Sequence, residues 1–162
     1  MMTTFCLFLI FLLACGAAGS TGVIFKPGTW YDGLIKPGFT PPNWVFPVAW
    51  TTIYVLIAWA AARLALLPGA GVALALWAAQ IALNTLWTPV FFGARRMGAG
   101  MAIIALLWLT VAALVIAAFR LDLWAGVLML PYLAWLCVAA ALNWRIWRDN
   151  TRRLQMPGDG PI

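Results

Sequence analysis

The residues best placed to carry chemistry are aromatic and amide side chains inside apolar stretches. Trp50 and Tyr54 are four residues apart, just after a long polar connection, so both fall on one face of a helix. A later stretch places five such residues on one helical face, namely Gln80, Asn84, Trp87, Thr88 and Phe91. A buried phenol or amide needs a hydrogen-bond partner. These faces indicate either contacts between helices or the wall of a ligand pocket, and the two interpretations are compatible.

The side chains of conventional catalysis are scarce. The chain has no histidine and no glutamate, and its aspartates are Asp32, Asp122, Asp149 and Asp159. Its cysteines, Cys6, Cys15 and Cys137, lack the spacing of a metal site. We therefore predict no metal, no cofactor, and neither acid–base nor nucleophilic catalysis. The 11 tryptophans suit instead a flat, hydrophobic, aromatic ligand held by stacking and burial.

Hydropathy decides which elements position these residues. Of the 162 residues, 65% are hydrophobic and only 9% are charged, against about half hydrophobic in a soluble domain. About 20 apolar residues cross a bilayer core. The charge-free runs predict five transmembrane helices at about 5–24, 44–64, 72–92, 99–119 and 123–144. The predicted fold class is thus an all-α integral membrane protein, a five-transmembrane-helix bundle in a single domain, 1–162.

The basic residues indicate the orientation of this bundle. Eight of them fall on the side of the first connection, the third connection and the C-terminal tail: Lys26, Lys36, Arg95, Arg96, Arg145, Arg148, Arg152 and Arg153. Only Arg63 and Arg120 fall on the other side. The positive-inside rule then places the first loop and the tail, 145–162, in the cytoplasm. Charge used in this way predicts no nucleic-acid partner. The first segment is interpreted as a retained helix rather than a signal peptide, because the residues before it carry no Lys or Arg.

Two further stretches have a predicted role. The connection 25–43 is long and rich in proline and glycine, so it is either a lid over a pocket or a plain connection. Gly71, Ala75 and Ala79 recur at four-residue spacing, the small-residue pattern that lets membrane helices approach closely. They predict a homodimer interface on the third span.

The ordered motifs of the chain resemble a known family. They are Pro41-Pro42-x-Trp44-x-Phe46-x-x-x-Trp50-x-x-x-Tyr54, Gln80-x-x-x-Asn84-x-x-Trp87-Thr88-Pro89-x-Phe91-Phe92-Gly93 and Leu142-Asn143. They resemble the tryptophan-rich sensory protein family, whose mitochondrial members are the translocator protein, or peripheral-type benzodiazepine receptor. The resemblance extends over about 6–150 and implies a five-helix bundle, commonly dimeric, with a pocket that opens toward the first loop.

The resemblance also implies ligands and site residues. The family's ligands include porphyrins such as protoporphyrin IX, sterols, and synthetic isoquinoline carboxamides or benzodiazepines. Matched by position, the ligand-binding residues are Phe46, Trp50, Tyr54, Asn84, Trp87, Thr88, Trp135, Ala139 and Leu142. The expected function is a membrane receptor or sensor for porphyrins in tetrapyrrole or stress regulation. The alternatives are light-dependent porphyrin degradation by Trp50 and Trp135, and facilitated transport of porphyrin or sterol.

Two departures from the family pattern limit what is carried over. Gly38-Phe39 stands where close bacterial relatives have a tryptophan pair, so we do not expect this part of the loop to stack on the ligand. Trp144 stands where the cholesterol-recognition pattern has tyrosine, and we predict no specific sterol site. The host membrane is either the inner or the outer membrane of a bacterium.

Overall fold

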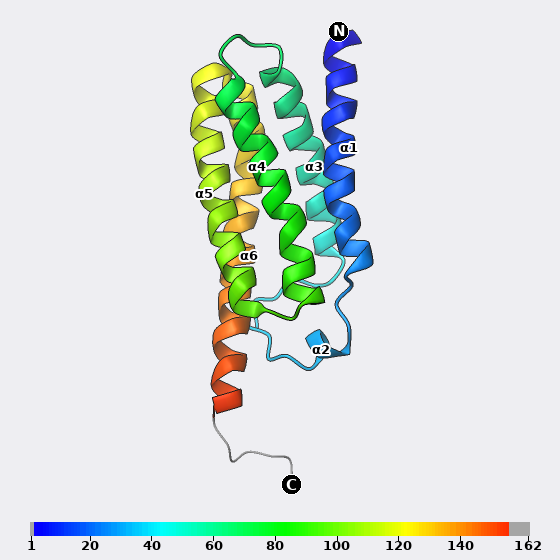
Figure 1. Cartoon of the computed structure of the whole chain (residues 1–162), viewed down its shortest axis with the longest axis vertical. Coiled ribbons are helices and arrows are strands. Elements are labelled where there is room, and N and C mark those ends of the chain that lie inside the picture. Colours follow the sequence, from blue (N-terminus) through cyan, green and yellow to red (C-terminus); the bar gives the residue numbers. More distant parts are fainter. Residues whose placement is uncertain (1, 156–162) are drawn as a thin grey trace.

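A computed structural model describes residues 2–155, and every regular element in this range is helical. The long helices are α1 (Met2–Ile24), α3 (Val45–Leu64), α4 (Gly71–Thr88), α5 (Met97–Leu121) and α6 (Leu123–Gln155). A short helix, α2 (Thr29–Asp32), interrupts the first connection, and a π-helix, η1 (Pro89–Gly93), follows α4. Five segments are long and apolar enough to cross a membrane. The long helices run side by side, with α2 at the end from which α6 emerges (Figure 1).

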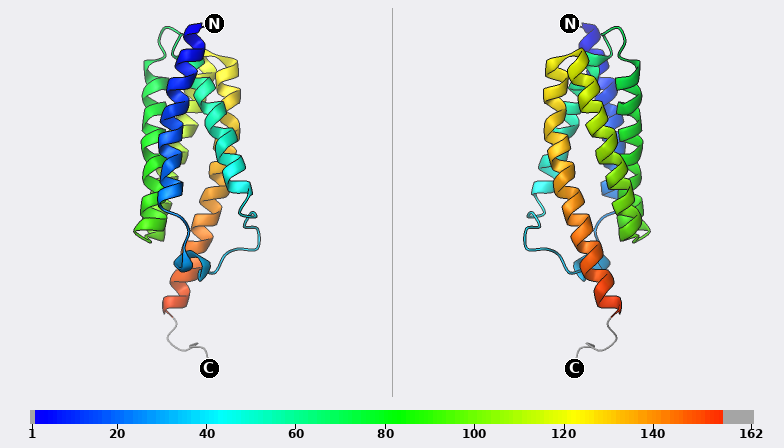
Figure 2. Two further views of the ribbon diagram at one scale, coloured as in Figure 1. Left: turned by 90° about the vertical axis from the view of Figure 1, so that its right-hand side faces the viewer. Right: turned by 90° about the vertical axis from the view of Figure 1, so that its left-hand side faces the viewer.

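The long helices pack against one another in specific pairs. The helix α1 packs on α3 and α4, whereas α5 packs on α4 and α6, and α3 also packs on α6. The ends of the bundle differ, since one carries the first connection and the other carries the N-terminus of α1 and the turn between α5 and α6 (Figure 2). We call these the connection end and the far end.

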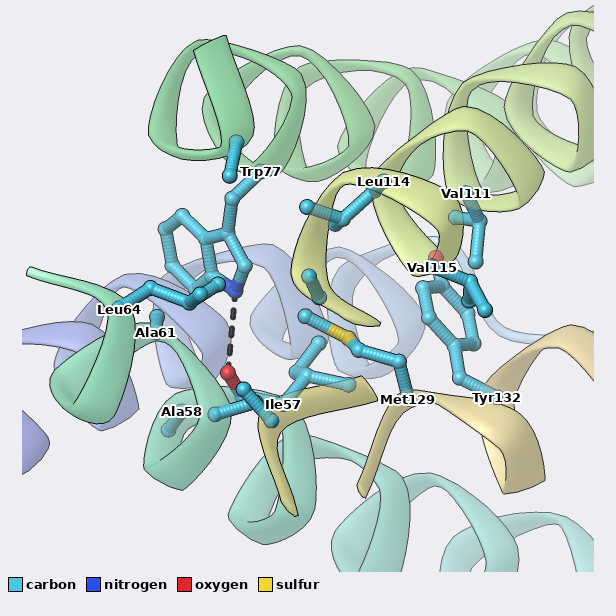
Figure 3. Close-up of a cluster of buried hydrophobic side chains, with 14 of the residues drawn as sticks. Ile57, Ala58, Ala61, Leu64, Trp77, Val111, Leu114, Val115, Met129 and Tyr132 are labelled. Carbon is cyan, nitrogen blue, oxygen red and sulfur yellow. Dashed lines mark hydrogen bonds between the residues drawn. The ribbon is translucent and has the colours of Figure 1, made fainter. Parts of the chain in front are cut away.

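The far end holds the dense core. On α3 the residues Ala58, Ala60, Ala61 and Ala62 are fully buried, and their small side chains allow close packing. Trp77 of α4 donates its indole N–H to the Ile57 carbonyl oxygen at 3.1 Å, across the cluster shown in Figure 3. The Arg63 guanidinium pairs with the Asp122 carboxylate at 2.6 Å and thereby joins the end of α3 to the α5–α6 turn.

The last helix runs well past the predicted limit of 144. It continues as helix through Gln155, so residues 145–155 of the predicted tail are helical. Hydropathy marks where a chain leaves the membrane, but it does not mark where a helix ends. No glycine or proline follows Pro131 until Pro157, and Arg145 pairs with Asp149 one turn later at 3.2 Å. The remainder of the predicted tail, 156–162, lies outside the described residues.

Candidate ligand-binding site

A cavity of about 620 Å³ lies at the connection end, with walls from all the long helices and from α2 and η1. All nine residues expected to bind ligand lie in its wall: Phe46, Trp50, Tyr54, Asn84, Trp87, Thr88, Trp135, Ala139 and Leu142. The volume is typical of small-molecule sites, which are mostly apolar with a few polar groups. The helical faces therefore converge on one space rather than on separate helix contacts.

The polar groups of the wall form a short hydrogen-bonded chain. The Tyr54 hydroxyl donates to Asn84 Oδ1 at 3.2 Å, and Asn84 Nδ2 donates to the Tyr132 hydroxyl at 3.0 Å. Tyr132 is buried in the core and was not expected in the site. A tyrosine beside Pro131 in an apolar stretch was the available signal. Gln80, one turn before Asn84 on α4, is fully buried and does not line the cavity. Its amide has no hydrogen-bond partner within residues 2–155.

The aromatic wall is built from rings in mutual contact. Trp50 lies 5.4 Å from Tyr54 and 6.1 Å from Tyr132, measured between ring centroids. One turn earlier on α3, Phe46 meets Trp135 of α6 edge-on at 5.8 Å. Such contacts hold each ring in one orientation, so the cavity presents fixed aromatic surfaces to whatever enters it.

The helix α4 ends in a way that turns two more rings toward the cavity. Pro89 lacks a backbone N–H and cannot continue the α-helical ladder, and the chain forms the π-helix η1 instead, a feature often found at functional sites. The Trp87 and Phe91 rings stack at 5.0 Å. The Trp87 indole N–H donates to Asn143 Oδ1 at 3.3 Å, and Asn143 Nδ2 donates to the Met97 carbonyl at 2.9 Å. Asn143 was not among the residues expected in the site.

Glycine in α1 makes room for the phenol. A Cβ atom on Gly19 would lie 2.9 Å from Tyr54 Cε2, so a larger residue would displace the ring that binds Asn84. Gly16 and Gly22 also line the cavity. The small residues of this helix therefore contribute a smooth wall as well as helix packing.

The first connection covers the same end of the cavity. Phe25, Pro27 and Tyr31 contribute to its lining, and the Tyr31 ring meets Phe92 at 5.3 Å. Lys36 Nζ lies 4.7 Å from the centre of the Tyr31 ring. Burial and the nearby Asp32 carboxylate raise the pKa of the Tyr31 phenol, and a phenol with its ordinary pKa of about 10 is already neutral at pH 7. The Tyr31 phenol and the Lys36 ammonium thus lie at the end of the cavity that the first connection covers.

Other predicted features lie away from the cavity. Gly71, Ala75 and Ala79 are exposed on α4. A second, shallow hollow lies on the outer face of α5 and α6, lined by Ala105, Trp108, Leu109, Cys137 and Ala140. Within residues 2–155, acidic, histidine and cysteine side chains form no group of three that could hold a metal ion.

Comparison with known proteins agrees with this architecture. The model of the TspO/MBR family matches residues 8–148. The chain is 55% identical to a tryptophan-rich sensory protein of Cereibacter sphaeroides, over 91% of this chain and 93% of that protein. It is 48% identical to protein CrtK of Rhodobacter capsulatus, over 96% of both chains, and 39% identical to the translocator protein of Sus scrofa, over 85% of both. The chain therefore belongs to the TspO/MBR family and is a multi-pass integral membrane protein with five transmembrane helices.

Proposed function

We propose that the protein is a membrane sensor that binds a porphyrin of the protoporphyrin IX type in the cavity at the connection end. The observation that carries the proposal is the composition of the wall, in which indole and phenyl rings surround a few polar groups, chiefly the hydrogen-bonded Tyr54 and Asn84. Flat tetrapyrroles offer large apolar faces to aromatic rings. The names of the relatives, a sensory protein and a translocator protein, agree with a protein that recognises a small molecule.

The proposed pose follows from the distribution of polar groups. Trp50 and Trp135 stack on the macrocycle, while Tyr54, Asn84 and Thr88 supply the polar contacts. The Lys36 ammonium, placed over Tyr31 at the covered end, is available to the propionate groups. A ligand with an apolar body and acidic edges fits this arrangement better than a sterol, which has no acidic group.

The test is a titration with protoporphyrin IX in the dark, followed by the porphyrin absorption shift. We expect saturable binding that Trp50→Phe and Trp135→Phe each weaken by about three- to tenfold, the loss of one aromatic contact. Trp108→Phe, in the hollow on the outer face, is the matched control and should bind like the wild type. Equal affinity for all four proteins would exclude the proposed pose.

Light-dependent porphyrin degradation is a second candidate. It is favoured by the position of Trp50 in the cavity wall, in contact with two tyrosine rings, where its indole can donate an electron to photo-excited porphyrin or to the oxygen species that the excited porphyrin generates. It predicts bleaching of bound porphyrin that requires light and either Trp50 or Trp135. Bleaching at the same rate by free tryptophan in detergent would argue against it.

Two further proposals concern assembly and orientation. A homodimer would cover the exposed face of Gly71, Ala75 and Ala79. Gly71→Leu should then lower the dimer fraction in detergent, and an unchanged fraction would refute this interface.

The excess of basic residues at the connection end supports a cytoplasmic position for that end. In a background with the native cysteines replaced by serine, an impermeant thiol reagent applied to intact cells should therefore label Leu66→Cys but not Asn43→Cys.

A further inference from the structure

The second half of the first connection is attached to α6 by one side chain. Asn150 lies beyond the bundle on the extension of α6 and is only 6% exposed. The Ile35 backbone N–H donates to Asn150 Oδ1 at 2.9 Å, and Asn150 Nδ2 donates back to the Ile35 carbonyl at 3.0 Å. The same Nδ2 donates to the Ile146 carbonyl at 2.8 Å. The amide thus satisfies both backbone groups of a residue 115 positions away, as a neighbouring strand would.

Apart from the Lys36 contact with the Tyr31 ring and one buried proline, little else holds this part of the connection. The Ile35 and Phe39 side chains are 44% and 53% exposed, so they contribute little apolar burial. Pro37 is the buried residue of this part. The first half, in contrast, is fixed by rings, because Trp30 and Tyr31 pack on Phe91 at 6.0 and 6.4 Å.

The first half of the connection borders the cavity, since Phe25, Pro27 and Tyr31 line that space. Lys36, next to Ile35, joins the second half to this lining, because its Nζ lies 4.7 Å from the centre of the Tyr31 ring. Figure 2 shows the connection crossing beneath the bundle between α1 and α3. Asn150 itself is not in the lining. An effect of Asn150 on a bound molecule must therefore pass through the connection.

We propose that Asn150 is a positioning residue that holds the first connection closed over the cavity and so sets the rate of ligand exchange. This inference rests on the proposed porphyrin site. If a ligand enters and leaves only when the connection opens, both the association and the dissociation rate scale with the open fraction. Weakening the pairing of Asn150 with Ile35 then raises both rates and leaves their ratio, Kd, nearly unchanged.

The experiment measures both rates for protoporphyrin IX by stopped flow in the dark, together with hydrogen exchange of the amides over 33–40. In Asn150→Leu, which keeps the apolar bulk and loses the hydrogen bonds, we expect both rates to rise about tenfold, as for the loss of one to two hydrogen bonds, with Kd changed less than threefold. The Ile35 amide should exchange faster. Asn43→Leu, at an exposed asparagine of the same connection, is the matched control and should leave both rates unchanged.

A second variant covers the case in which Asn150→Leu does not fold. Asn150→Asp keeps an acceptor for the Ile35 N–H but puts an oxygen in place of the nitrogen that donates to the Ile35 and Ile146 carbonyls, so both rates should rise in this variant as well. Faster amide exchange with ligand rates within twofold of the wild type would show that the connection is not the barrier and would overturn the proposal. Unchanged amide exchange would show that Asn150 does not hold the connection. An absence of saturable binding in the wild type would instead overturn the porphyrin site, and this inference with it.

Discussion

At the far end of the bundle α3 presents buried alanines to its neighbours, whereas at the connection end the same helix presents Phe46, Trp50 and Tyr54. Small residues let the helices touch, and the far end is filled by the core of Figure 3. Large rings hold the helices apart, and the α1 and α3 ribbons diverge toward the connection end in Figure 2. The helix α3 thus packs closely with its neighbours at the far end and lines the cavity at the connection end. Stability and binding are therefore expected to depend on different ends.

The largest effect is expected from one substitution made at each end. Ala61→Leu adds volume to a fully buried position and should destabilise the protein by about 1–3 kcal/mol, because a packed core must shift to accommodate it. Ala139→Leu adds the same volume at the cavity wall and should cost less than about 1 kcal/mol. Thermal unfolding of both variants in detergent is the measurement. Equal destabilisation would mean that the two ends are packed alike.

The hydrogen-bonded chain offers a test at the boundary between the two ends. Asn84→Leu removes the partner of the buried Tyr132 hydroxyl, and an unsatisfied buried group costs about 1–3 kcal/mol. Adding Tyr132→Phe removes that hydroxyl and should recover part of the loss. Unfolding of the two single variants and the double variant gives the coupling. Strict additivity would show that the Asn84–Tyr132 hydrogen bond contributes nothing to stability.

The smallest effect concerns the ion pair at the far end. The Arg63 hydrogen bond, with the Ala125 N–H and the Arg63 charge, holds the pKa of Asp122 below its ordinary value despite partial burial. Asp122 also caps α6, where its Oδ1 accepts the Ala125 N–H at 2.7 Å. Asp122→Asn can keep this cap but loses the ion pair, so we expect a loss of at most about 1 kcal/mol at pH 7.

This difference should depend on pH in one direction. A lowered pKa in the folded state adds stability above the unfolded value of about 3.9, and that stability is lost as the pH falls through the folded value. The wild type should therefore be more stable than Asp122→Asn at pH 7, and the gap should close as the pH falls through the lowered pKa of Asp122. A gap that stays constant over the whole acid range in which both proteins remain folded would show that the carboxylate charge is not its source.

The sequence predicted the residues of the cavity wall better than the residues that hold them in place. Helical periodicity determines which residues share a face, and apolar length determines which segments span the membrane, so residues such as Trp50 and Asn84 could be assigned before any contact was known. Tyr132 and Asn143 join the site only because α4 and α6 meet at particular heights, which periodicity within one helix does not determine. The π-helix after Thr88 needed the local backbone, since Pro89 alone indicates only an interruption. Asn150 and Ile35 are 115 residues apart, and no spacing rule relates them.

The most direct test of the account compares the same substitution in the cavity at the connection end and in the shallow hollow on the outer face. Ala139 lines the cavity, and Ala105 lines the shallow hollow on the outer face of α5 and α6. Protoporphyrin IX would be titrated in the dark into the wild type, Ala139→Leu and Ala105→Leu, all of them checked for folding by thermal unfolding. The account predicts at least about a tenfold weaker affinity for Ala139→Leu, because a leucine takes up ligand space, and wild-type affinity for Ala105→Leu. Weakened binding by Ala105→Leu with unchanged binding by Ala139→Leu would contradict the account and place the ligand on the outer face.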